Sequence, residues 1–251
     1  MVQIDAGHFS RDASVELSEA LAKPASFKLM YFPILANGAT GRDLLAYGGV
    51  EWSPISPADW KAEKDQTPFH VMPLLFVTGE NGKTATLAET VVIEHYLAKK
   101  FGLLGSNEYE ESIIKSFHSS SAAIMSAFAS SVTWNTPEGK AGGLEFFTTS
   151  TLPTWIATHE KHLIDNGNNG HYVGDKLSLA DIRTANIIEQ FVTQPESATL
   201  MAIINKSVPL TKLRDTVAKH PKMAQWRSGS EYKSYYEANV AFYANPYAFI
   251  S

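Results

Sequence analysis

The chain reads Phe27-Lys28-Leu29-Met30-Tyr31-Phe32 near its beginning, an apolar run with the length and composition of a buried strand. A second run of this kind reads Val71-Met72-Pro73-Leu74-Leu75. Between the two runs, a loop rich in Gly and Asn at residues 33–41 leads into an expected helix at 42–47, which a Gly-Gly pair ends. The pattern therefore predicts a strand, a helix and another strand, with Tyr31 at the end of the first strand.

The region around the second run predicts further strands and then a helix. A short strand is expected at 50–55, and two more at 74–77 and 85–87, joined by an Asn-Gly step that is typical of a hairpin turn. From Glu89 onward, apolar residues recur with helical spacing. The order β-α-β followed by β-β-α is typical of a thioredoxin-like arrangement, in which helices cover a small sheet.

The rest of the chain has helical spacing throughout. Residues 102–107 contain Gly, Ser and Asn and predict a linker. We therefore expect an α/β domain at residues 27–104 and an all-helical domain at 105–251. Residues 1–26 are an extension, with an expected helix from Ser10 to Ala22 whose role stays open. The helices expected in the second domain are 108–132, a broken 140–165, 178–194, 196–206, 209–219 and 222–237.

Composition narrows the class of protein. The chain has 251 residues, 44% of them hydrophobic, a formal net charge of −5 and no cysteine. The sequence has no Lys/Arg cluster of the kind that binds nucleic acid. No apolar stretch reaches the ~18–20 residues that span a bilayer, and the first residues lack a secretion signal. We therefore expect a cytoplasmic protein without nucleic-acid or membrane partners. Because the chain has no thiol, a thiol in any reaction has to come from a ligand.

These features together resemble the glutathione-binding half of a cytosolic glutathione S-transferase, sigma-like in its details. The resemblance rests on Tyr31 at a strand end, on Met72-Pro73 before a strand, and on Glu89-Thr90 at a helix start. It implies the fold of that family, a thioredoxin-like N-terminal domain followed by an all-helical C-terminal domain. The string from Tyr172 to Asp181, with its Ser-x-x-Asp capping pattern, is similar to a structural motif of the family's C-terminal domains.

The resemblance implies a role for each of these residues. The Tyr31 hydroxyl is expected to donate to the glutathione sulfur, and the backbone of Met72, before a cis Pro73, to pair with the tripeptide. The helix start at Glu89-Thr90 suits the γ-glutamyl carboxylate. Each residue also has a plainer interpretation, because a strand Tyr usually packs, an X–Pro bond is usually trans, and Thr or Glu often caps a helix.

A helical turn before the second strand run adds two further candidates. Trp60 and Lys64 lie four residues apart, hence on one helical face, and resemble the sigma-class residues that hold the glycyl end of glutathione. A solvated amphipathic turn would show the same spacing.

The loop after Tyr31 departs from the family pattern. Members usually pass from Tyr-Phe to Gly-Arg within a few residues, whereas here residues 33–40 come before Gly41 and Arg42. We expect Arg42 to take part in glutathione binding. The added length also brings in Asn37 and Thr40 as alternative donors to the sulfur.

The second substrate is expected to be a small hydrophobic electrophile bound between the two domains. Phe32, Phe117 and Met125 are the expected walls of that site. A stripe with the helical spacing of Phe117 and Met125 is more often part of a core than of a pocket.

Two remaining patterns are weaker. His159 and His162 lack a third ligand at metal-binding spacing. We therefore expect that both histidines face solvent and that the protein binds no metal. The aromatic segment 242–250 is expected to fold back as a lid, as a strap along a dimer or as a core patch.

The resemblance implies a homodimeric glutathione transferase that conjugates the glutathione thiolate to small hydrophobic electrophiles, a detoxification activity. The alternatives are a non-catalytic ligand-binding or structural member of the family, and a glutathione-dependent isomerase or peroxidase. The natural electrophile is not indicated by any residue.

Overall fold

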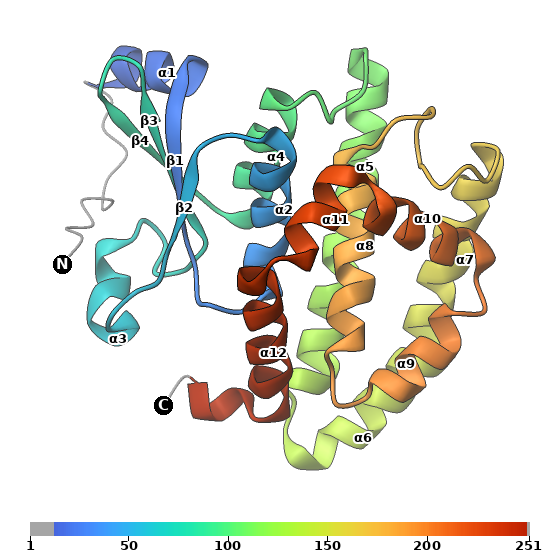
Figure 1. Ribbon diagram of the computed structural model, residues 1–251. Helices are drawn as coiled ribbons and strands as arrows, with labels where there is room; N and C mark the ends of the chain where they lie inside the picture. The colour runs from blue at the N-terminus through green and yellow to red at the C-terminus, as the bar shows by residue number, and fades with distance from the viewer. Residues whose placement is uncertain (1–12, 250–251) are drawn as a thin grey trace. The chain divides into compact units, whose positions relative to one another are not determined.

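The computed structural model describes residues 13–249 and divides into two compact units, the first ending at Leu97 and the second beginning at Ala98 (Figure 1). Most of the helix expected from Ser10 is described, but residues 10–12 lie outside that range, as does the end of the aromatic segment.

The first unit is built on a four-stranded sheet in the order β2-β1-β3-β4. From Phe27 to Leu29 the side chains of β1 alternate, with Phe27 and Leu29 buried and Lys28 exposed, as the period of a strand requires, and Met30 at the end of the strand is buried as well. Strand β2 runs parallel to β1, while β3 is antiparallel to both β1 and β4. The strands are β1 (Pro24–Met30), β2 (Trp52–Ile55), β3 (Leu74–Gly79) and β4 (Thr84–Ala88).

The hairpin and the helices of this unit follow the expected order. The hairpin expected from the Asn-Gly step joins β3 and β4. Its Gly82 has a φ of 73°, a left-handed conformation that glycine adopts without strain. The helical segments are α1 (Ser14–Ala22), η1 (Ala36–Gly38), α2 (Ala39–Gly48), α3 (Trp60–Glu63), η2 (Lys64–Gln66) and α4 (Thr90–Lys100), which leads into the second unit.

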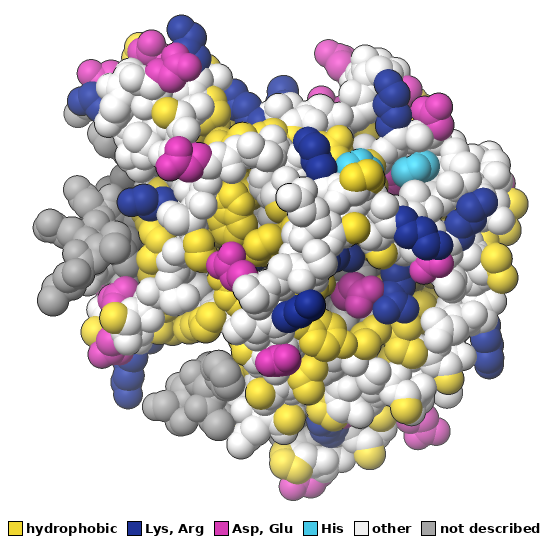
Figure 2. Space-filling view, viewed as in Figure 1, with side chains coloured by type: hydrophobic (Ala, Val, Ile, Leu, Met, Phe, Trp, Pro, Cys, Tyr) yellow, Lys and Arg dark blue, Asp and Glu magenta, His cyan; other side chains and the backbone are white. Residues whose placement is uncertain are grey.

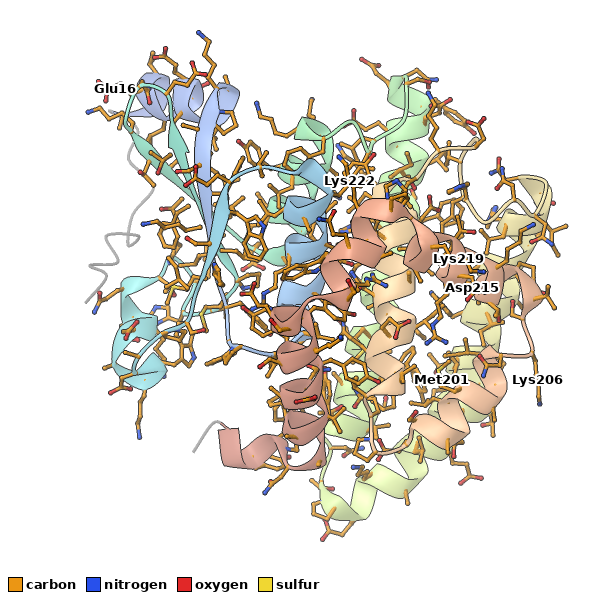
Figure 3. The ribbon with its side chains drawn as sticks, viewed as in Figure 1. Glu16, Met201, Lys206, Asp215, Lys219 and Lys222 are labelled. Atoms are coloured by element: carbon orange, nitrogen blue, oxygen red, sulfur yellow. The ribbon has the colours of Figure 1, made fainter. Side chains whose placement is uncertain are left out.

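Helix α1 packs against the β3–β4 hairpin, which gives the N-terminal extension a structural role. The Asn81 side chain donates to the Glu16 carbonyl at 3.0 Å, and the Glu16 carboxylate, labelled in Figure 3, pairs with Lys83 at 3.2 Å. The Tyr96 hydroxyl of α4 donates to the Leu21 carbonyl at 2.9 Å, and burial raises the pKa of Tyr96 to about 12. Strand β1 also begins at Pro24, earlier than expected, because Pro24 pairs with the end of β3.

Gly79→Ala is expected to destabilise the first unit by about 1–3 kcal/mol, because α1 leaves no room for a side chain there. A Cβ at Gly79 would lie 2.4 Å from the Ala20 Cα and 2.8 Å from Asn81 Oδ1. Urea denaturation measures the loss of unfolding free energy. The control is Gly142→Ala, at a helical position where a Cβ meets nothing within 4 Å; equal stability of the two variants would contradict the predicted clash.

The second unit is entirely helical, with α5 and α8 packed against each other (Figure 1). The Ser121 and Thr184 hydroxyls, one on each of these helices, lie 2.7 Å apart, so small side chains bring the two helices close. The helices are α5 (Glu108–Phe128), α6 (Pro137–Phe146), α7 (Leu152–Asp165), α8 (Leu179–Val192), α9 (Ser197–Ile204), α10 (Val208–Lys219), α11 (Pro221–Ser228) and α12 (Ser230–Ala244), with π-helical turns η3 (Ala129–Thr133) and η4 (Phe147–Thr151) and a final 3₁₀ turn η5 (Pro246–Phe249).

The core of the second unit contains an aromatic cluster. The rings of Phe128, Phe147 and Phe191 are buried, with centroids 5.1–6.0 Å apart. The expected capping box at the start of α8 is confirmed, because Asp181 Oδ2 accepts from the Ser178 N–H at 2.9 Å while the Ser178 hydroxyl accepts from the Asp181 N–H.

The end of the chain departs from one expectation. The single helix expected at 222–237 is wrong, because extended backbone at Gly229 (φ −67°, ψ 154°) separates α11 from α12. In the aromatic segment, the Phe242 and Tyr247 rings lie 6.2 and 5.8 Å from the Trp134 ring of the same unit, and Tyr247 stays 54% exposed; these contacts do not choose between a lid, a strap and a core patch.

The surface carries charges of both signs. On the face seen in Figure 2, Lys and Arg side chains (dark blue) are interspersed with Asp and Glu side chains (magenta). None of the helices between residues 13 and 249 is long and apolar enough to cross a bilayer.

Candidate functional site

The register of the sheet brings the expected site residues to one edge. Met30 pairs with Ile55 of β2 and with Leu74 of β3, and Leu74 pairs with Ala88 of β4. Met30, Ile55, Leu74 and Ala88 thus form one row across the sheet. The residues that follow this row at the same end of each strand therefore lie side by side, spaced by the ~4.8 Å between neighbouring strands. They are Ser56, Tyr31, Pro73 and Glu89.

Tyr31 lies in the middle of this edge and is held on several sides. Its N–H donates to the Ile55 carbonyl at 3.0 Å, and its carbonyl accepts from the Ser56 hydroxyl at 3.3 Å. Its side-chain oxygen accepts the backbone N–H of Asn37 at 3.3 Å. The phenol is thus largely buried, at 7% exposure, with a defined position.

Arg42 holds the loop that follows Tyr31. Its guanidinium donates to the Phe32 carbonyl at 2.8 Å and to the Ile34 carbonyl, and lies 5.8 Å from the centroid of the Tyr31 ring. The side chain is buried, so the structure places it beneath the loop, where it supports Tyr31. Its direct part in glutathione binding stays a prediction.

The two alternative donors of the loop lie in different surroundings. The Thr40 side chain is fully buried inside the unit, whereas the Asn37 side chain is exposed. Asn37 reaches Tyr31 through its backbone N–H.

The Met72–Pro73 peptide bond is cis, as expected. Met72 precedes β3 and is largely buried, and among residues 13–249 it has no backbone hydrogen-bond partner. Its N–H and C=O thus continue the sheet edge by one residue that an extended ligand could pair with.

Helix α4 starts beside this edge. Glu89 is exposed, with a left-handed φ of 73°, and its carbonyl accepts the N–H of Ile93 at 3.0 Å. Thr90 is the first helical residue and is half-buried. The first N–H groups of a helix and its positive dipole end favour a carboxylate at this position.

Trp60 reaches the loop after Tyr31, and Lys64 lies one turn further along the chain. The Trp60 and Phe32 rings meet edge to face at 6.0 Å, and the Asp59 carboxylate caps this short helix by accepting from Ala62 N–H at 3.2 Å. Lys64 is exposed and begins η2. The register and these contacts bring Tyr31, Phe32, Trp60, Pro73 and Glu89 to one side of the first unit.

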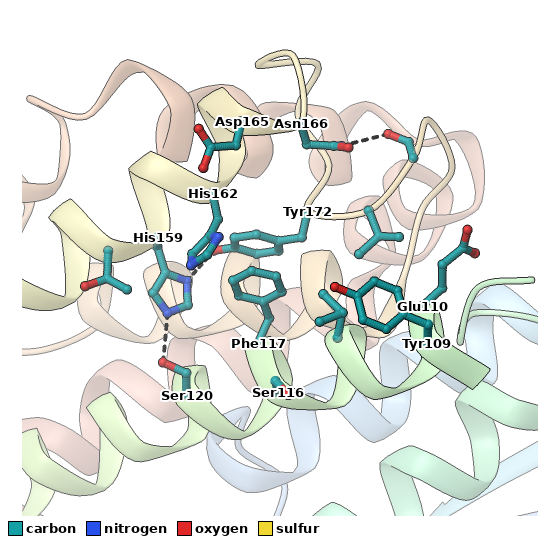
Figure 4. A pocket seen from close by; sticks show the side chains of 14 residues that line it. Tyr109, Glu110, Ser116, Phe117, Ser120, His159, His162, Asp165, Asn166 and Tyr172 are labelled. Atoms are coloured by element: carbon teal, nitrogen blue, oxygen red, sulfur yellow. Dashed lines mark hydrogen bonds between the residues drawn. The ribbon is translucent and has the colours of Figure 1, made fainter. Parts of the chain in front are cut away.

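Phe117 and Met125 lie in the second unit, and the contacts of Phe117 are internal to it. Its ring stacks on Tyr172 at 4.2 Å, and both residues line a cavity of about 570 Å³ between α5, α7 and the loop at 166–174 (Figure 4). Met125 is buried on the same helix, at 8% exposure. Their role as walls for an electrophile stays a prediction.

His159 contradicts the expectation of solvent-facing histidines, because it is 1% exposed. Its Nε2 lies 2.9 Å from the Ser120 hydroxyl and its Nδ1 contacts the Tyr172 hydroxyl (Figure 4). Burial, and secondarily the charge of His162, lower the pKa of His159 to about 4, and burial raises that of Tyr172. The sequence shows two histidines three residues apart but not which one faces inward, because that depends on packing between helices.

His162 remains exposed, as expected. Within the described part of the chain, no group of three His, Asp or Glu side chains has the arrangement of a metal site.

Known proteins similar to this chain share one family. Residues 123–229 match the family model "Glutathione S-transferase, C-terminal domain". A probable glutathione S-transferase 6 of Caenorhabditis elegans is 25% identical over 79% of this chain and 90% of its own length. The S-crystallin SL11 of Nototodarus sloanii is 26% identical over 80% of this chain and 95% of its own. The solved structure of prostaglandin synthase D of Nilaparvata lugens superposes with a TM-score of 0.69 and 27% identity, covering 81% of this chain and 97% of that one.

Proposed function

We propose that this chain, which belongs to the cytosolic glutathione S-transferase family, binds glutathione at the sheet edge of its first unit and transfers the thiolate to small hydrophobic electrophiles. The main support is the arrangement at that edge. Along it lie the Tyr31 phenol, the Met72 backbone, which has no backbone hydrogen-bond partner among residues 13–249, and the start of α4. This order matches the thiol, the extended backbone and the γ-glutamyl carboxylate of glutathione.

The Tyr31 hydroxyl would act on the sulfur. A free thiol has a pKa of about 8.5, so little thiolate exists at neutral pH, and a hydrogen bond donated to the sulfur favours the anion. The thiol proton leaves to solvent, and the thiolate then forms a bond to the electrophilic carbon. In a substitution this bond displaces a leaving group, which departs with its electron pair; in an addition the electron pair of the attacked double bond takes a proton from solvent. Lowering the thiol pKa by about two units corresponds to about 2.7 kcal/mol, which a charge-assisted hydrogen bond in a partly buried site supplies.

Titration calorimetry with glutathione is expected to show saturable binding. The Kd should lie in the roughly micromolar to millimolar range that is ordinary for metabolite sites. The same tripeptide with alanine in place of cysteine should bind with similar affinity, because backbone pairing and the α4 start hold the peptide. Absence of both heat and a thermal shift at high millimolar glutathione would refute the proposed site.

A second candidate function is a non-catalytic ligand-binding or structural role, which the similarity to an S-crystallin supports. A glutathione-dependent isomerase or peroxidase is the third. Incubation with glutathione and a panel of electrophiles and hydroperoxides, followed by mass spectrometry, separates the three. A conjugate supports the transferase, whereas oxidised glutathione or a rearranged substrate supports the third candidate. Detoxification and a cytoplasmic location belong to the transferase proposal.

We expect the protein to form a homodimer, because the first unit exposes several large apolar side chains that a second copy would cover. Phe69 is 51% exposed, Val71 44%, Val91 43% and Val92 49%. Light scattering should give twice the monomer mass of 27.5 kDa, and Phe69→Ser should shift the equilibrium toward monomer. A monomer mass over a wide concentration range would contradict this expectation.

A further inference from the structure

The cavity between α5, α7 and the loop at 166–174 has the size of a small-molecule site (Figure 4). Its volume of about 570 Å³ falls within the roughly 300–1,000 Å³ of ligand pockets. The 14 described residues that line it lie between Tyr109 and Gly174, so they all belong to the second unit. No described residue of the sheet edge proposed to bind glutathione is among them.

Aromatic side chains make up much of the cavity wall. The Phe117 ring stacks on Tyr172 with centroids 4.2 Å apart and meets the His162 ring edge to face at 5.1 Å. Tyr109, which is 75% exposed, adds a further ring. Rings of this kind bind flat aromatic molecules and also attract cations through their faces.

A hydrogen-bond network supplies a polar anchor in the same wall. Ser120 Oγ lies 2.9 Å from Nε2 of the buried His159, whose Nδ1 contacts the hydroxyl of the buried Tyr172. All three residues line the cavity. Because a hydroxyl has one O–H and two acceptor lone pairs, the half-buried Ser120 can form a further hydrogen bond with an N–H or O–H of a ligand.

The loop on one side of the cavity is held by asparagine side chains. Asn166 Nδ2 donates to the carbonyls of His171 and Gly174 at 2.9 and 2.8 Å, and Asn169 Nδ2 donates to the Gly174 carbonyl at 2.7 Å. This wall is therefore preformed, and a ligand that binds there does not have to order the loop.

The charges around the cavity favour a cation. Glu110 and Asp165 line it, and none of the described lining residues is Lys or Arg. Asp165 pairs with Lys161 at 2.6 Å, whereas Glu110 has no Lys or Arg partner in the described part of the chain. The N–H and the hydroxyl of Ser106 each donate to Glu110 at 2.7 Å and lower the pKa of Glu110, so its carboxylate is charged at neutral pH.

We propose that this cavity binds an aromatic amine, with the flat ring against Phe117 and the protonated amine near Glu110. The ring wall favours the aromatic part, the unmatched carboxylate favours the positive charge, and Ser120 favours an N–H or O–H on the ring. The site is separate from the glutathione chemistry proposed above and does not depend on it.

Titration calorimetry with three indoles of similar size tests the preference for charge. Tryptamine is expected to bind with a Kd between about 10 µM and 1 mM, and indole-3-acetate about tenfold more weakly or worse. The neutral 3-methylindole should fall between them. Equal affinity for tryptamine and indole-3-acetate, or no binding of tryptamine at high millimolar concentration, would overturn the proposal.

Glu110→Gln removes the charge and keeps an acceptor for Ser106. It should weaken tryptamine binding about three- to fivefold, the effect of one partly exposed ion pair, and leave 3-methylindole binding unchanged. Glu111→Gln removes the same charge one residue further along α5, at a residue that does not line the cavity, and should keep the wild-type affinity. An equal loss in both variants would contradict the contact with Glu110.

A matched pair of serines tests the location of the site. Ser116 and Ser112 are both exposed on α5 and donate to the carbonyl four residues earlier, at 2.9 and 2.8 Å, but only Ser116 lines the cavity. Ser116→Phe should fill the cavity and lower tryptamine affinity about tenfold or more, whereas Ser112→Phe should bind like the wild type. Urea denaturation checks that both variants fold, and equal binding by the two folded variants would refute this location.

Competition separates this site from the proposed transferase site. S-hexylglutathione would fill the thiol site and an adjoining electrophile site, and it should leave tryptamine binding unchanged. Displacement of tryptamine would assign the cavity to the electrophile and overturn a separate site. If the protein binds no glutathione but binds the three indoles in the expected order, the proposed function fails and this inference stands.

Discussion

Tyr31→Phe is expected to lower the rate of glutathione conjugation at neutral pH by about ten- to hundredfold, about 1.4–2.7 kcal/mol of transition-state stabilisation. The substitution removes one oxygen and keeps the ring that packs against Phe32 and Arg42. Glutathione affinity should change little, because in the proposed site the backbone at Met72 and the start of α4 hold the tripeptide. The measurement is kcat and KM against a small hydrophobic electrophile.

The pH dependence of this loss identifies its cause. Above the free thiol pKa of about 8.5, solvent already supplies the thiolate, so the gap between wild type and Tyr31→Phe should shrink. A residue that only packs would lower the rate equally at every pH.

A matched control removes a hydroxyl elsewhere in the first unit. Tyr96→Phe deletes the hydrogen bond to the Leu21 carbonyl, at the α1 side of the sheet, and should keep the wild-type rate. Tyr31 would lose its assigned role if Tyr31→Phe kept full rate at pH 6.5 while Asn37→Ala or Thr40→Ala lost it.

Acidification from pH 6.5 to pH 4 is expected to cost the second unit about 3 kcal/mol of unfolding free energy through His159 alone. Burial lowers the His159 pKa to about 4 in the folded protein, against 6.5 when it is solvated. Between these two values the unfolded chain binds a proton that the folded protein does not, so stability falls with pH. The contribution is fully present above pH 6.5 and is lost progressively toward pH 4.

His159→Gln separates this effect from the titration of carboxylates. The variant should be less stable than the wild type at pH 7, because it alters contacts with Ser120 and Tyr172. The difference in unfolding free energy between wild type and variant, measured in urea, should narrow between pH 6.5 and pH 4. His162→Gln changes an exposed neighbour and should keep most of the wild-type pH dependence. A constant difference between wild type and His159→Gln across this range would show that His159 does not titrate as expected.

The sequence alone determined the parts of the fold that depend on neighbours along the chain. The apolar run that ends at Tyr31-Phe32, the Asn-Gly hairpin and the capping box at Ser178 predicted strands, turn and helix start, because each is set by local backbone geometry and hydrogen bonding. The cis bond before Pro73 was predicted from the family resemblance, since local preference favours trans.

The tertiary structure decided where side chains point and what they touch. It placed the Arg42 guanidinium beneath the loop, brought the Asn37 N–H to the Tyr31 oxygen, and buried His159 while leaving His162 exposed. It also joined α1 to the β3–β4 hairpin. These outcomes depend on contacts between segments distant in sequence or on the path of a loop with no periodic pattern, and burial and hydrogen bonding in those contacts outweigh local preference.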